Sequence, residues 1–144
     1  PIDARLTVFH DILYFFEYIV SQNYVAIDFY DGSIMYDFEN DKTTICDIDS
    51  FRKQPCINDM GRMWGSSLFQ SPEEYQIGAA IDEITNVYTL GATAFALFGE
   101  YNRTRDKWQL SDKLFEIATR AVSDDRIDRQ QSIRQLIEEW EAAL

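Results

Sequence analysis

Residues 24–37 read YVAIDFYDGSIMYD and place two β-prone runs, YVAI and SIMYD, on either side of an acidic turn. The turn carries Asp28, Asp31 and Gly32, which are ordinary turn residues. The pattern predicts two short strands joined by this turn. Two interpretations stay open at this point: a solvent-exposed turn, or a loop that presents a carboxylate to a substrate.

The regions on both sides of this stretch predict a helix before it and a long loop after it. Residues 4–22 have apolar side chains at spacings of three and four, which is typical of a largely buried helix. A polar turn, FENDK, leads to a third β-prone run, TTICDID. Residues 50–70 then read as a loop, and loops of that length are usually functional. At SPEE, Ser71, Pro72 and Glu74 fit a capping box with proline at the first helical position.

The second half of the chain predicts three helices. Residues 87–98 are apolar on every side and should pass through the core. Ser111 and Ser132 fit as N-caps of two amphipathic segments, and Gln135 completes a capping box with Ser132. Residues 1–144 therefore predict a single, mainly helical domain with a small β component.

Composition excludes several classes of function. The formal net charge of −12 argues against nucleic-acid binding and against docking on anionic lipid. No apolar run approaches the roughly 20 residues of a membrane-spanning helix. The start of the sequence lacks signal-peptide features, which favours the cytoplasm. Cys46, Cys56 and the single His10 lack the spacing of a zinc site, so we expect free thiols.

The order of acidic residues and motifs resembles the large, C-terminal lobe of the protein kinase fold. Asp28 opens a loop after a strand, Asp47 ends the third β-prone run, and GSSLFQSPEE follows. In the family, a loop with a catalytic Asp precedes a metal-binding Asp, and the activation segment ends in Ala-Pro-Glu. The resemblance implies a mainly α-helical kinase-like lobe with a small β ribbon.

Further motifs extend the resemblance over nearly the whole chain. GSSLFQSPE is similar in spacing to the family's Gly-Thr, Tyr and Ala-Pro-Glu signature, and TNVYTLG to the start of its central helix. SDDRIDR is similar to the late Asp-Pro-x-x-Arg segment. The resemblance implies an ion pair between Glu73 and Arg129. It also implies that residues 47–73 form an activation-segment-like loop, with Ser66 and Ser67 shaping a substrate-binding loop or accepting phosphate.

The resemblance also assigns candidate roles to individual residues. Asp28 would be the catalytic base or would position the attacking hydroxyl. Asp47 would bind Mg²⁺ and ATP, with Asp49 as a rival ligand and Ser33 as an ancillary one. The implied cofactors are therefore ATP and Mg²⁺. Asp31 is more simply a solvated turn residue.

Several residues depart from the family's pattern. Ala26 and Ile27 replace the His-Arg pair before the catalytic Asp, and Tyr30 replaces its lysine. Ser33 stands where the family has Asn, and Asn86 where its central helix has Asp. The chain also shows no glycine-rich loop and no lysine-bearing strand of a small lobe. We therefore expect a lobe of a longer protein that is inactive alone and whose partner is the missing N-terminal lobe.

Three functions remain open from the sequence. The first is a serine/threonine protein kinase that phosphorylates a protein hydroxyl, because Gly65-Ser66 resembles the Gly-Thr of such kinases. The second is a pseudokinase that acts as a binding or regulatory module, favoured by the missing catalytic-loop residues. The third is a small-molecule phosphotransferase, against which GSSLFQSPEE counts. The apolar lobe face could also pair with a second copy to form a homodimer.

Overall fold

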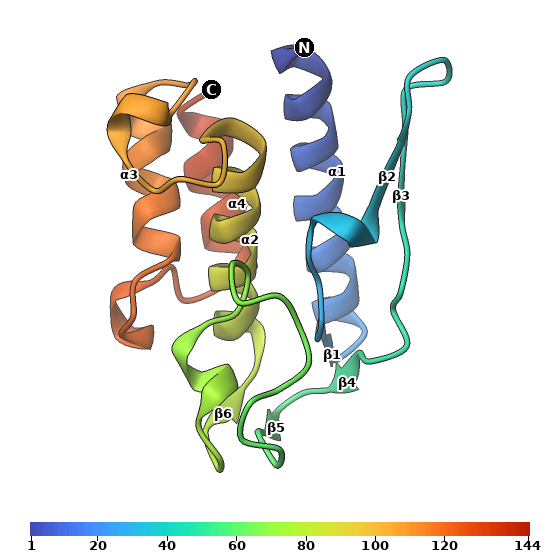
Figure 1. Ribbon diagram of the computed structural model, residues 1–144, viewed down its shortest axis with the longest axis vertical. Helices are drawn as coiled ribbons and strands as arrows, with labels where there is room; N and C mark the ends of the chain where they lie inside the picture. The colour runs from blue at the N-terminus through green and yellow to red at the C-terminus, as the bar shows by residue number, and fades with distance from the viewer.

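The computed structural model describes all residues, 1–144, and contains four α-helices with three small antiparallel sheets (Figure 1). The helices gather on one side, and the sheets and the long green loop lie below and beside them. No helix is both long and apolar enough to cross a membrane. The helices are α1 (Ile2–Ser21), α2 (Glu83–Phe98), α3 (Asp112–Ala121) and α4 (Ile133–Ala142).

Each sheet consists of two strands. The pairs are β1 (Tyr24–Val25) with β4 (Arg52–Lys53), β2 (Ile34–Asp37) with β3 (Lys42–Ile45), and β5 (Cys56–Ile57) with β6 (Ala80–Ile81). The expected hairpin around Asp28 is wrong, because the YVAI and SIMYD runs do not pair with each other. SIMYD instead pairs with the third run across FENDK. The YVAI run leaves its sheet after Val25, because the amide and carbonyl of Ala26 bond to the Asn86 side chain instead of to a neighbouring strand.

Helix α2 is the centre of the fold. It begins at the N-cap Asp82, whose side chain accepts a hydrogen bond from the Ile84 amide at 2.9 Å. It contacts each of the other three helices, and most of its residues are buried, as the apolar 87–98 segment predicts. A Cβ atom on Gly91 would lie 2.7 Å from the Ala121 Cβ, so only glycine lets α3 approach this closely.

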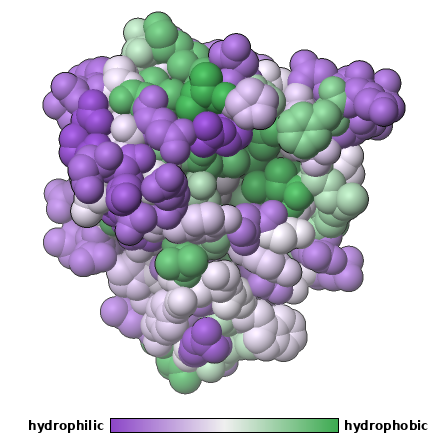
Figure 2. Space-filling view, turned by 45° about the horizontal axis from the view of Figure 1, so that its top comes forward, coloured by the Kyte–Doolittle hydropathy of each residue, from purple (hydrophilic) through white to green (hydrophobic).

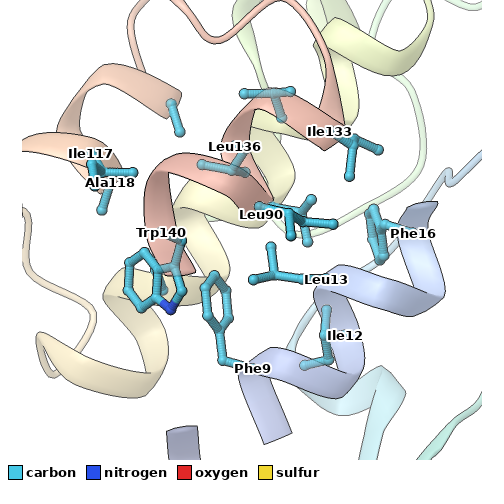
Figure 3. Packing of buried hydrophobic residues seen from close by; sticks show 14 of the residues in the cluster. Phe9, Ile12, Leu13, Phe16, Leu90, Ile117, Ala118, Ile133, Leu136 and Trp140 are labelled. Carbon is cyan, nitrogen blue, oxygen red and sulfur yellow. The ribbon is translucent and has the colours of Figure 1, made fainter. Parts of the chain in front are cut away.

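The main hydrophobic core lies between the four helices (Figure 3). Phe9 and Phe16 point from α1 toward α2 and α4, and Leu90 and Trp140 meet them from the other side. The rings of Phe9 and Trp140 lie 4.7 Å apart, centroid to centroid, in an edge-to-face arrangement. This core fixes the position of α2, which in turn fixes the loops around its N-terminal end.

The predicted caps are present with two differences. Ser111 Oγ accepts from the Leu114 amide at 3.2 Å, and Ser132 Oγ accepts from the Gln135 amide at 2.9 Å. The Gln135 side chain, however, accepts from the amide of Gln131 instead of Ser132, so the second capping box is shifted by one residue. The Ser71 capping box forms, but it begins only a one-turn 3₁₀ helix, Pro72–Tyr75.

The surface also has an apolar groove between α1, β2 and the end of α2. On the face in Figure 2, hydrophobic surface gathers between two hydrophilic flanks. Phe38, at the tip of the β2–β3 hairpin, is 73% exposed. The apolar lining residues are Pro1, Ala4, Val8, Ile34, Tyr36, Phe38 and Leu97.

Candidate functional site

The loop that carries Asp28 is attached to the central helix by one side chain. Asn86, fully buried in the first turns of α2, accepts a hydrogen bond from the Ala26 amide at 2.8 Å. Its amide group also donates to the Ala26 carbonyl at 2.9 Å. The two bonds satisfy both backbone groups of a buried residue. Asn86 thus holds the backbone two residues before Asp28 against the core.

Asp28 and Asp47 both lie at sharp turns, and the negative charge of Asp47 acts on Asp28. Their φ angles are 60° and 57°, in the left-handed region that residues other than glycine rarely adopt. Asp28 is half-buried and Asp47 is exposed. Burial raises the pKa of Asp28 above its usual value, and the negative charge of Asp47 raises it further. The charge on one loop therefore acts on a carboxylate of another loop.

An open pocket of about 320 Å³ lies beside Asp28. Tyr30, Gly65 and Ser66 complete its lining, so the first part of GSSLFQSPEE faces the catalytic-loop candidate. The ring of Tyr30 lies over Gly32, where an added Cβ would stand 2.3 Å from Tyr30 Cε2. The absence of a side chain at Gly32 is what leaves room for the Tyr30 ring in this position.

The other candidate ligands are less well placed. Ser33 is buried, and its hydroxyl accepts from the Tyr30 amide at 3.4 Å instead of facing the pocket. Its carbonyl accepts from the Cys46 amide at 2.8 Å, which ties the two loops together. Asp49 is exposed. No group of three or more His, Cys, Asp or Glu side chains comes together as a metal site. Among these candidate ligands, Asp47 is the one whose charge raises the pKa of Asp28.

The SPEE segment is held by a buried ion pair. Arg129, with no exposed surface, donates to both carboxylate oxygens of Glu73, at 2.7 and 2.9 Å. The structure thus brings together the two residues that the resemblance pairs. Arg126 also donates to Glu73, at 2.8 Å, and to both oxygens of Asp82. Arg126 was not predicted as a partner of Glu73, and its place in SDDRIDR is the only sequence signal for this role.

Burial and charge shift the pKa values of neighbouring carboxylates in opposite directions. Burial alone would raise the pKa of Glu73, but the hydrogen bonds and charge of Arg129, with help from Arg126, lower it to about 2. Burial raises the pKa of Glu74 to about 7, although hydrogen bonds from Ser71 oppose the shift. Two adjacent glutamates thus differ in protonation near neutral pH.

Replacing Asp47 by asparagine should lower the pKa of Asp28 toward its usual value. The substitution removes the neighbouring negative charge and leaves the burial of Asp28 in place, so part of the shift should persist. A ¹³C NMR titration of the Asp28 carboxyl group measures this change. Asp49→Asn is the matched control in the same segment. An equal shift in that variant would contradict the specific pairing of Asp28 with Asp47.

Glu74 should make the protein less stable as the pH rises. Its folded-state pKa of about 7 exceeds the ordinary 4.5, so between these values the unfolded chain loses a proton that the folded chain keeps. The free energy of unfolding should fall by about 3 kcal/mol across this window. Urea denaturation at pH 5 and pH 8 measures the fall. Glu74→Gln should abolish this component, whereas the exposed Glu138→Gln should retain it.

Comparison with known proteins supports the fold and provides no close relative. No protein-family model and no curated protein matches the sequence. The structure matches the solved structure of the kinase PK-1 of Cydia pomonella granulovirus with a TM-score of 0.77 and 14% sequence identity. The match covers 96% of this chain and 58% of the viral protein. The chain therefore has a protein-kinase-like fold and spans less than two thirds of that neighbour.

Proposed function

We propose that this chain is the large lobe of an ATP-dependent protein kinase that transfers the γ-phosphate to a serine or threonine hydroxyl. One observation supports this proposal most directly. Asp28 and Asp47 come from different loops, yet the negative charge of Asp47 raises the pKa of Asp28, which lies beside the pocket that Ser66 lines. Phosphoryl transfer needs one carboxylate for the acceptor hydroxyl and one for the metal ion that accompanies ATP.

The two carboxylates are suited to different tasks. The raised pKa of half-buried Asp28 makes it a stronger base than an ordinary aspartate, which suits a group that accepts a hydroxyl proton. Exposed Asp47 offers the hard oxygen ligands that Mg²⁺ prefers. When bound there, Mg²⁺ would neutralise phosphate charge. The two hydrogen bonds between the Asn86 side chain and the Ala26 backbone would keep Asp28 in place while an acceptor enters the pocket.

Calorimetric titration with Mg²⁺-ATP tests this function. The titration compares this chain with the longest natural product that contains it, because the chain spans only 58% of its structural neighbour. Binding that requires the longer product and is lost in Asp47→Asn supports a two-lobed kinase. The Asp49→Asn variant is the control and should bind normally. No binding by either product would overturn the kinase proposal.

A second candidate is a pseudokinase that serves as a binding module. The observation that favours it is the buried hydroxyl of Ser33, which bonds to the Tyr30 amide and leaves only one well-placed metal ligand beside Asp28. A pseudokinase predicts that Asp28→Asn leaves partner binding unchanged. A kinase predicts that the same substitution abolishes phosphate transfer by the longer product.

A further inference from the structure

Two exposed arginines next to the loop that lines the pocket of Asp28 have no acidic partner. The chain holds 25 carboxylate side chains and 13 cationic ones, so most arginines form ion pairs. The paired ones are Arg52, Arg105, Arg120, Arg126, Arg129 and Arg134. Of the others, Arg5 donates from α1 to the Leu97 carbonyl, whereas Arg62 and Arg103 contact residues of the activation-segment-like loop and its end.

Arg103 is held in place by neutral groups. It donates to the Tyr88 hydroxyl at 2.9 Å and to the Leu68 carbonyl at 3.1 Å, and its guanidinium lies 5.2 Å from the centre of the Tyr88 ring. The nearby Tyr101 hydroxyl donates to the Asp31 carboxylate at 2.6 Å, which fixes the loop that carries Arg103. Arginine has five N–H donors, so these contacts leave donors free for an anion.

Arg62 lies beside a second tyrosine ring. Its guanidinium carbon is 6.0 Å from the centre of the Tyr75 ring. The Tyr75 hydroxyl donates to Gln70 Oε1 at 2.9 Å, and Gln70 Nε2 donates to the Met63 carbonyl at 2.7 Å. These bonds close residues 63–70 into a compact loop. Both arginines are therefore attached to the same short segment, each beside an aromatic ring.

The same segment exposes two large apolar side chains. Trp64 is 63% exposed and Leu68 is 53% exposed, whereas Met63 is buried. Arg62 and Trp64, on either side of Met63, thus both face solvent. Arginine and tryptophan are enriched where proteins bind one another. We call Arg62, Trp64, Leu68 and Arg103 together the arginine surface.

We propose that the arginine surface binds an acidic peptide segment of a partner protein. Carboxylates of the peptide pair with the two guanidinium groups, whose planar donors match carboxylate oxygens. An apolar side chain of the peptide packs against the two exposed apolar residues of the surface. Ser66 belongs to the same segment and lines the pocket of Asp28. That this peptide is a substrate, with its hydroxyl directed to Asp28, rests on the proposed function, whereas its binding does not.

The net charge of −12, taken alone, predicts a basic partner instead. At physiological salt the field of an exposed charge falls off over about 8 Å, so charges within the surface outweigh distant ones. The two arginines are the charged side chains of the surface, and neither forms an ion pair within the chain. Acidic and basic peptides therefore distinguish local recognition from attraction by the overall charge.

Fluorescence polarisation with the full chain tests the proposal. The labelled probe is a peptide with one serine, one leucine and several aspartates, and matched peptides carry asparagine or lysine in place of the aspartates. The acidic peptide should bind about tenfold more tightly than the neutral one, as expected for two exposed ion pairs. Arg62→Gln and Arg103→Gln should each reduce this ratio about threefold, and the double variant should abolish it.

Arg103→Lys covers the case of a poorly folded glutamine variant, because it keeps the charge and should retain part of the preference. The matched control is Lys113→Gln, which removes an exposed positive charge from α3, outside the arginine surface. It changes the net charge equally and should leave the ratio unchanged.

Three results would overturn the proposal: no binding of any peptide, no preference for the acidic one, or an equal loss of preference in Lys113→Gln and the arginine variants. The measurement uses no ATP. Its failure is therefore distinguishable from a failure of the proposed kinase function, which the Mg²⁺-ATP titration detects.

Discussion

Arg129→Met is expected to lower the free energy of unfolding by about 3–5 kcal/mol, the cost of breaking a buried ion pair from one side. Arg129 has no exposed surface, and its loss leaves the buried carboxylate of Glu73 with Arg126 as its remaining charged partner. It also leaves the carbonyls of Ser123 and Asp124 without the bonds that Arg129 donates at 2.8 and 3.1 Å. Urea denaturation at pH 7 measures the effect.

The control is Arg134→Met, which removes a half-exposed arginine that pairs with the half-buried Glu17. That substitution should cost less than about 1 kcal/mol. The double variant Glu73→Gln/Arg129→Met should lose less stability than the two single variants added together, because it leaves no unpaired buried charge. A cost for Arg129→Met no larger than for Arg134→Met would contradict the structural role of the pair.

The same pair should contribute to acid sensitivity. The pKa of Glu73 in the folded chain, about 2, lies below its ordinary 4.5. The stabilisation is therefore fully present above pH 4.5 and is lost as the pH falls toward 2. Glu73→Gln should flatten this part of the stability profile. The effect is opposite in sign to that of Glu74, so each substitution should change only its own part of the profile.

Asn86→Asp should cost about 2–4 kcal/mol at pH 8, although it changes only one atom. A carboxylate can still accept from the Ala26 amide, but it cannot donate to the Ala26 carbonyl, which would then face a buried negative charge. The loss should be smaller at low pH, because a protonated aspartate can donate. Urea denaturation at pH 4 and pH 8 measures both values.

Asn102→Asp provides the control for this substitution. Asn102 also donates to a backbone carbonyl, that of Glu100, at 2.9 Å, but it is exposed to water. Water can replace this bond, so the cost should stay below about 1 kcal/mol. Equal losses in the free energy of unfolding at the two positions would show that the Asn86 hydrogen bonds do not hold the loop before Asp28 in place.

The sequence predicted the helices and the segments that resemble a kinase lobe, because those features depend on local residue patterns. Apolar spacing located α1 and α2, and cap residues located α3 and α4. Strand pairing was wrong around Asp28, since pairing depends on which partner is near in space. The YVAI run pairs with Arg52–Lys53, two residues that are distant in sequence and that no strand pattern had singled out.

The details of the candidate site were harder to predict because they depend on side-chain direction. Asn86 appeared from the sequence only as a departure from the family, whereas in the fold its amide makes two bonds that an ionised aspartate could not make together. Ser33 appeared as a metal ligand, but the 3₁₀ turn that begins at Asp31 directs its hydroxyl to the Tyr30 amide. The contact of Tyr101 with Asp31 joins residues 70 positions apart.

The position of Asn86 on the most buried helix has a consequence for the motion of the loop before Asp28. The Ala26 amide proton is bonded to a side chain of α2, and α2 contacts every other helix. This proton can exchange with solvent deuterium only when α2 separates from the core, which is global unfolding. Its exchange rate should therefore match that of the slowest amides in α2. The backbone next to the candidate base would open as rarely as the core itself.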